Sequence, residues 1–223
     1  MSETIKVDVW SDVACPWCYI GKRKFEAGAA DFAEGRADAP PVEVEFHSFE
    51  LSPEMPVDFE GTSIDFLVRH KRISEARVRE MQENVSGIAA TVGLHYDFEA
   101  LRPTNTLKAH QLLHLGKTLG VQSELKERLL SAHFVEGRHV GRDDDLADLA
   151  ADVGMEREKV LRSLRDEEFL PAVRDDQRSA TQLGIRGVPF FVIGGRYAIS
   201  GAQPSDVFTE ALRQVDGEKD VAV

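Results

Sequence analysis

Both cysteines of this 223-residue chain lie in one short motif, Cys15-Pro16-Trp17-Cys18. A cysteine reacts as its thiolate, and the start of a helix stabilises a thiolate through free backbone N–H groups and a partial positive charge. A helical pattern runs onward from Pro16, so Cys15 stands at the helix start and Cys18 lies about one turn further along. We therefore expect Cys15 to form a mixed disulfide with a substrate and Cys18 to release that substrate.

A close cysteine pair can also be half of a zinc site. Zinc takes four ligands in such sites, and the chain has no second cysteine pair. His110 and His114 are four residues apart, but no third ligand accompanies them. We therefore predict redox chemistry and no metal site, and two cysteines are too few for a structural disulfide framework.

Pro189 is expected to belong to the same site, although it lies far away in the sequence. It stands in Gly187-Val188-Pro189-Phe190, at the start of a strand-like segment. A cis proline facing the cysteines would leave the backbone of Val188 free to pair with an extended peptide. An ordinary edge-strand proline is the alternative, and the presence of the cysteine pair favours the first interpretation.

The segments around the motif predict the elements that position it. Residues 5–10 alternate apolar and polar side chains as a strand does, a helix extends from Pro16 to about Gly35, and residues 42–46 form a second strand. This order is a βαβ unit, whose right-handed crossover makes the two strands parallel.

Strand character returns near the C-terminus. Residues 188–193 and 196–199 are two strands, and Gly194-Gly195 between them predicts a two-residue hairpin loop. A last helix covers about residues 204–215. The chain therefore closes with a β-β-α unit.

The middle of the chain carries helical patterns and no strand signals. Its apolar residues recur at spacings of three and four, and Ser123 is the expected cap of one of these helices. We predict an α/β protein with a thioredoxin fold, β-α-β and β-β-α, interrupted by an all-helical insertion. Residues 1–61 and 184–223 would form the thioredoxin-like domain, and residues 62–183 the helical insertion or lid domain.

The chain is acidic, with a formal net charge of −12 and a pI near 5.1. Nucleic acids and anionic membranes bind to clusters of lysine and arginine, and no basic stripe occurs here, so neither is an expected partner. The first residues, Met1-Ser2-Glu3-Thr4, lack the basic and apolar regions of a secretory signal. We therefore expect a cytoplasmic protein.

Four motifs together resemble the FrnE-type branch of the DsbA-like thioredoxin superfamily, and the resemblance spans nearly the whole chain. It implies thiol–disulfide oxidoreductase or disulfide isomerase activity, with Cys15 as nucleophile, Cys18 as resolving thiol and Pro189 as the cis-proline. The branch is similar to 2-hydroxychromene-2-carboxylate isomerases and kappa-class glutathione transferases, which usually carry serine at the position of Cys15, and this difference favours dithiol chemistry. The motifs are residues 12–21, Pro103-Thr104-Asn105-Thr106 with Ala109-His110, Gly187-Val188-Pro189-Phe190-Phe191, and Ile199-Ser200-Gly201-Ala202-Gln203.

Two further residues bear on the reactivity of the pair. Trp17 occupies the position where periplasmic DsbA proteins have a histidine that stabilises the thiolate, and an indole carries no such charge. We therefore expect a Cys15 pKa below the free value of about 8.5 but above the roughly 3.5 of DsbA. Asp8 lies where thioredoxin-like proteins often keep a buried acid, so it is a candidate to take a proton from Cys18; an exposed strand residue is the alternative.

Four residues are weaker candidates for substrate contacts. The resemblance makes Asn105 and His110 possible contacts on the lid side. Ser200 and Gln203 precede the last helix, whose N–H groups could hold the carboxylate of a glutathione-like thiol, and a plain helix cap explains them equally well.

The expected substrates are disulfide-containing proteins or small thiols, together with a reducing or oxidising recycling partner. We expect no bound cofactor. The alternative function is a glutathione- or mycothiol-dependent transferase or isomerase, in which the small thiol is the cosubstrate. A peptide-binding or chaperone module without catalysis is a third hypothesis, and a monomer and a homodimer are both compatible with the sequence.

Overall fold

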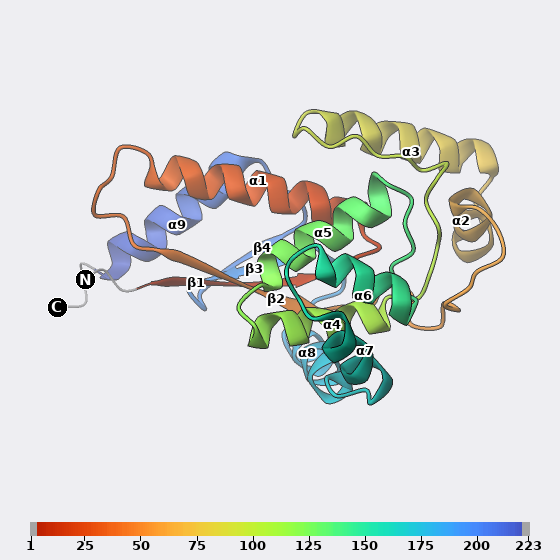
Figure 1. Ribbon diagram of the computed structural model, residues 1–223. Helices are drawn as coiled ribbons and strands as arrows, with labels where there is room; N and C mark the ends of the chain where they lie inside the picture. Colours follow the sequence, from red (N-terminus) through yellow and green to blue (C-terminus); the bar gives the residue numbers. More distant parts are fainter. Residues whose placement is uncertain (1–3, 220–223) are drawn as a thin grey trace.

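The computed structural model describes residues 4–219 (Figure 1), so the ends of the predicted thioredoxin-like domain, residues 1–3 and 220–223, lie outside the described residues. None of the helices in this part of the chain is long and apolar enough to cross a membrane. The elements at the two ends of the chain are β1 (Ile5–Ser11), α1 (Pro16–Ala33), β2 (Val42–Ser48), β3 (Phe190–Ile193), β4 (Tyr197–Ser200) and α9 (Ser205–Lys219). Between β2 and β3 lie α2 (Ser63–Lys71), α3 (Glu75–Ala90), α4 (Leu107–Thr118), α5 (Gln122–Phe134), α6 (Asp143–Ala151), α7 (Arg157–Arg165) and α8 (Leu170–Gln182).

The strands form one sheet in the order β2-β1-β3-β4. β1 and β2 are parallel, with Ile5 opposite Val42, as the βαβ pattern predicts. β3 is antiparallel to both of its neighbours, β1 and β4. The β-α-β and β-β-α units predicted from the sequence therefore share one sheet, with the helical insertion between β2 and β3.

The hairpin between β3 and β4 is confirmed, but its loop is one residue longer than predicted. Gly194 and Gly195 both adopt positive φ angles of 60° and 67°, which side chains other than glycine rarely allow. The Arg196 N–H donates to the Ile193 carbonyl at 3.1 Å and closes the turn. The strand ladder starts again only with Tyr197 opposite Ile193, so Arg196 belongs to the loop.

Different helices cover the two faces of the sheet. One face carries Val7, Val9 and Phe191 and packs against α1 and α9 (Figure 1). On the other face, Trp10 packs with Ala180 of α8. Because α1 lies across the sheet, its first turn is held at the end of β1, where residues 12–15 connect the two elements.

The insertion has a core of its own, in which α4, α5, α6 and α7 bury leucine side chains against one another. Val13, in the connection between β1 and α1, is fully buried within this same core. The connection that carries Cys15 is therefore fixed from two sides, by the sheet and by the insertion.

Two details of the insertion differ from the sequence prediction. Helix α2 was not predicted, because its short segment is rich in charges; Thr62 and Asp65 form a capping box that begins it. The expected cap of α5, Ser123, is wrong, since the helix already begins at Gln122. The tight turn from α4, in which Val121 N–H donates to the Gly116 carbonyl at 2.9 Å, starts α5 earlier.

Gln122 forms hydrogen bonds with the backbone of β2 at one edge of the sheet. Its amide accepts a hydrogen bond from the backbone N–H of Phe46 and donates one to the Phe46 carbonyl, each at 2.9 Å. β2 is an edge strand, and the side chain thus supplies both partners that a neighbouring strand would offer to Phe46.

Candidate active site

The cysteine motif begins α1, as predicted. Cys15 is the N-cap residue, with extended backbone angles (φ −96°, ψ 112°), and Pro16 is the first helical residue. The Cys18 N–H donates to the Cys15 carbonyl at 3.0 Å. Both cysteines are free thiols and each is only 3% exposed, whereas the Trp17 side chain between them is 38% exposed.

Val188, which precedes Pro189, contacts Cys15, although 173 residues separate the two in the sequence. The Cys15 thiol donates to the Val188 carbonyl at an Sγ–O distance of 3.5 Å. The Val188–Pro189 peptide bond is cis. Pro189 also rests on α1, because a Cβ added at Gly21 would lie 2.8 Å from its Cγ.

Asp12 places a buried negative charge below the motif. Its carboxylate accepts the N–H groups of Ala14 (3.2 Å) and Leu51 (2.8 Å) and the Nε2–H of His110 (3.3 Å). Burial alone would raise the pKa of this carboxyl, but the hydrogen bonds lower it to about 2. Asp12 is therefore ionised throughout the physiological pH range.

Lys126 of α5 is the buried positive group of the site. It is 1% exposed, and its Nζ has no hydrogen-bond partner among the described residues. The ammonium lies over the Phe46 ring, 5.7 Å from the centroid. Burial lowers the pKa of Lys126, and the charges of Cys18 and Asp12 oppose that effect.

The surroundings favour the thiolate on Cys18. Burial alone would raise its pKa, but the hydrogen bond from Cys15, the charge of Lys126 and the side chain of Ser11 together lower it. The pKa of Cys15 is raised by its hydrogen bond with Cys18 and by burial. In the dithiol, the pKa of Cys15 is therefore raised, which is opposite to the expected direction.

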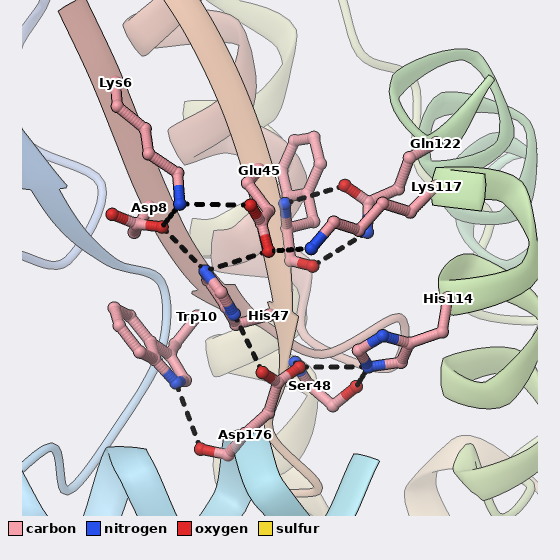
Figure 2. Close-up of polar contacts among 11 residues, drawn as sticks. Lys6, Asp8, Trp10, Glu45, His47, Ser48, His114, Lys117, Gln122 and Asp176 are labelled. Carbon is pink, nitrogen blue, oxygen red and sulfur yellow. Dashed lines mark hydrogen bonds and ion pairs between the residues drawn. The ribbon is translucent and has the colours of Figure 1, made fainter. Parts of the chain in front are cut away.

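Asp8 does not lie beside Cys18, so its predicted role as proton acceptor is wrong. Its carboxylate is bound by His47 Nε2 at 2.8 Å and by Lys6 at 3.1 Å (Figure 2). The ring of Trp10 stacks on His47 at a centroid distance of 4.6 Å. Successive strand residues point to opposite faces, and Val7 and Val9 occupy the face under α1. Asp8 consequently points to the face that α8 covers.

The network around Asp8 connects the sheet to the insertion (Figure 2). His47 Nδ1 lies 2.8 Å from Asp176 of α8, and the Asp176 carboxylate also accepts the Ser48 N–H at 2.7 Å and contacts His114 Nε2 of α4 at 3.0 Å. Burial opposes a charge on His47, but the hydrogen bonds that its ring donates to Asp176 and Asp8 raise its pKa to about 9. These contacts hold α8 and α4 against β2.

Asp8, Glu45 and His47 also bring three ligand atoms within 4.8 Å of one another. Lys6 pairs with both carboxylates at 3.1 Å, and Lys117 forms an ion pair with Glu45. The two ammonium groups already balance the carboxylates, so the group is an ion-pair network that leaves no net negative charge to attract a cation.

Asn105 and His110, the expected contacts on the lid side, form hydrogen bonds within the fold. The Asn105 amide donates to the Pro53 carbonyl at 3.0 Å, and its Oδ1 accepts the N–H of Leu107, the first residue of α4, at 2.8 Å. His110 is fully buried, and its Nε2 is bound to Asp12. Both side chains are used within the fold.

The segment from Ser200 to Gln203, the weaker candidate for holding a carboxylate, lies next to Pro189 and is hydrogen-bonded within the protein. The Gly201 N–H donates to the Pro189 carbonyl at 2.8 Å, and the Gln203 N–H donates to the Gly201 carbonyl at 3.0 Å. The Gln203 amide donates to the Ser200 carbonyl at 2.8 Å. The N–H groups of Gly201 and Gln203 are thus already paired within the protein.

Sequence reasoning missed Lys126 and assigned no role to Asp12. Lys126 interrupts the apolar stripe that Leu125 and Leu129 form on α5. A lysine at a core-facing position is rare enough to signal a buried charge. Asp12 stands three residues before Cys15, where the strand has ended and only the tertiary fold buries it.

The chain matches a protein family and is similar to known proteins over nearly its whole length. Residues 6–213 match the family described as DSBA-like thioredoxin domain. A probable DsbA oxidoreductase from Streptomyces coelicolor is 37% identical, and its crystal structure superposes with a TM-score of 0.87 over 96% of this chain and 91% of that chain. The Bacillus subtilis (strain 168) protein YwbO is 27% identical over 218 residues, which are 97% of this chain and 100% of that protein.

A 2-hydroxychromene-2-carboxylate isomerase is similar in fold, with a TM-score of 0.72 at 14% identity over 98% of this chain and 100% of that chain. The match shows that the same architecture can hold different chemistry. The predicted thioredoxin fold with a helical insertion is confirmed. With its Cys15–Cys18 pair, the chain belongs to the DSBA-like thioredoxin domain family of oxidoreductases.

Proposed function

We propose that this protein is a cytoplasmic thiol–disulfide oxidoreductase of the FrnE type, which reduces or isomerises disulfides through a mixed disulfide on Cys15. One observation carries the proposal. The N-cap cysteine of α1 contacts the carbonyl of Val188, next to Pro189, at 3.5 Å, and Cys18 follows one turn later. This arrangement presents Cys15 beside a backbone segment with which a bound peptide can pair.

The reaction begins with the proton that the two sulfurs share. Its transfer from Cys15 to Cys18 creates a Cys15 thiolate, which the N–H groups at the start of α1 stabilise. This thiolate attacks a substrate disulfide, so that a Cys15–substrate bond forms and one substrate sulfur leaves as a thiolate. The substrate thiolate that left takes the proton of Cys18, and the Cys18 thiolate attacks Cys15 Sγ. This step forms the Cys15–Cys18 disulfide and releases the second substrate sulfur as a thiolate.

The proposed direction depends on the reduced thiols of the compartment, because a pair whose reduced state is stabilised is itself a weaker reductant. Lys126 and Ser11 favour the Cys18 thiolate, and a stabilised thiolate favours the reduced state of the pair. In a compartment that contains reduced thiols, the pair rests as the dithiol, which is the form that attacks disulfides. A small thiol or a protein reductant then returns the oxidised pair to this state.

The rival function is a transferase or isomerase that uses glutathione or mycothiol as cosubstrate. The pairing of the Gly201 and Gln203 N–H groups within the protein removes two donors that could have bound the carboxylate of a small thiol, and this favours the dithiol reaction. Removal of the Cys18 thiol distinguishes the two functions, since only the dithiol reaction needs a resolving thiol.

Insulin reduction with dithiothreitol as reductant tests the proposal, and reactivation of scrambled ribonuclease tests isomerisation. We expect activity in the wild type, none in Cys15→Ser, and loss of multiple turnovers in Cys18→Ser. Activity of Cys18→Ser that persists and requires glutathione or mycothiol would support the rival function. Full function of Cys15→Ser in peptide binding would instead support a chaperone role.

A further inference from the structure

Lys126 is an unusual residue for the interior of a helical domain. It is 1% exposed, and no described group hydrogen-bonds its Nζ. An ammonium group without a hydrogen-bond partner in the interior destabilises a fold by several kcal/mol unless nearby charges compensate it. The buried ammonium group of Lys126 therefore requires a negative group nearby.

The position of Lys126 next to the cysteine motif is fixed by its neighbours on α5. The carboxylate of Glu127 accepts the phenol of Tyr19 at 2.5 Å and pairs with Lys22 of α1 at 2.7 Å. On the other side, Leu125 packs in the same core as Val13. α5 is thus attached to the residues on both sides of Cys15.

The charged groups that act on Lys126 are Cys18, Asp12, Cys15 and Lys22. Asp12 already accepts hydrogen bonds from two backbone N–H groups and from His110. Lys22 is positive and cannot compensate Lys126. Asp12 stays ionised and compensates part of the charge of Lys126, and of the two sulfurs Cys18 is the one whose pKa this charge lowers.

We propose that Lys126 is the buried counter-charge of the Cys18 thiolate, and that it makes Cys18 an effective resolving thiol. The inference rests on the proposed function. Lys126 is a positioning residue: it forms no bond with the substrate, and it acts through Cys18.

The step that Lys126 assists is the second displacement. The Cys18 thiolate attacks Cys15 Sγ in the mixed disulfide, the Cys15–Cys18 bond forms, and the bond from Cys15 to the substrate breaks. The electron pair leaves on the substrate sulfur, so the enzyme dithiol is oxidised by two electrons and the substrate disulfide is reduced by two. Once Cys18 is neutral, Asp12 is the remaining negative group near Lys126.

The test is a thiolate titration by ultraviolet absorbance in the Cys15→Ser background, which leaves Cys18 as the only thiol. We expect Lys126→Met to raise the pKa of Cys18 by about 1 or more, since a close opposite charge lowers a pKa by about 1–3. Lys126→Arg should retain the low pKa. Lys117→Met, which removes an ammonium group outside the site, should leave the Cys18 titration unchanged.

A second readout uses the pair with both cysteines. At pH 7, the mixed disulfide of Cys15 with a small aromatic thiol should persist about tenfold longer in Lys126→Met than in the wild type, which corresponds to about one pKa unit. If Lys126→Met fails to fold, Lys126→Gln replaces it in both measurements. An unchanged Cys18 pKa in a folded neutral variant overturns the inference, and it leaves the proposed function intact because insulin reduction by the wild type tests that separately.

Discussion

The contact between Gly21 and Pro189 gives a sharp prediction about how α1 positions the site. A Cβ at residue 21 would lie 2.8 Å from Pro189 Cγ and 3.5 Å from the Phe191 ring. Ordinary carbon–carbon contacts are about 3.5–4.0 Å, so Gly21→Ala must displace Pro189 by roughly 1 Å. Pro189 follows Val188, whose carbonyl contacts Cys15, and the displacement therefore changes the site itself.

Two opposing effects set the magnitude. Alanine is better than glycine inside a helix by about 1 kcal/mol, whereas overpacking a close contact costs about 1–3 kcal/mol. We expect Gly21→Ala to lower the free energy of unfolding by about 1 kcal/mol. A misplacement of about 1 Å near the reacting atoms can reduce turnover by on the order of a hundredfold, so activity should fall much more than stability.

Gly87→Ala is the matched control, because Gly87 lies inside α3 and a Cβ there meets nothing within 4 Å. This variant should gain up to about 1 kcal/mol and keep its activity. Urea unfolding and insulin reduction measure the two quantities. If Gly21→Ala is stabilised as much as Gly87→Ala and remains fully active, Pro189 does not rest on α1 as described.

Two further predictions concern the contacts between the sheet and the insertion. The pKa of His47 is raised from 6.5 to about 9 by its hydrogen bonds with Asp176 and Asp8, against the effect of burial, so it stabilises the fold fully below pH 6.5 and loses this contribution as the pH rises through 9. The loss should reach about 3 kcal/mol in urea unfolding between pH 6.5 and 9.5, and His47→Gln should remove this slope; an equal slope in the variant would contradict the assignment. Gln122→Leu leaves the N–H and C=O of Phe46 unpaired, so we expect a loss of about 1–3 kcal/mol and faster amide exchange at Phe46, and unchanged exchange there would refute the role of Gln122.

The sequence predicted those parts of the site that local signals encode. Cys15 and Pro16 carry a helix start in their own residue types, and the strand patterns around Pro189 are equally local. The predicted hairpin loop was one residue too short. Arginine is a residue that a strand can contain, and only the pairing of Tyr197 with Ile193 shows that Arg196 lies in the loop.

The parts that failed depend on contacts between distant segments. Asp8 alternates correctly along its strand, but only the packing of α8 shows that its face carries His47 and Asp176. His110 could not be recognised as a partner of Asp12, because 98 residues separate them. Lys126 gave a signal within its apolar stripe, yet its relation to Cys18 depends on how α5 packs against α1.

The most direct test of the central claim is the trapping of the mixed disulfide. Cys18→Ser should accumulate a stoichiometric adduct on Cys15 when it is incubated with a disulfide-containing peptide, as read by intact mass spectrometry and peptide mapping. Cys15→Ser should form no comparable adduct at neutral pH. Equal adduct formation on Cys18 in Cys15→Ser, or the absence of any adduct on Cys15 in Cys18→Ser, would contradict the assignment of Cys15 as the nucleophile.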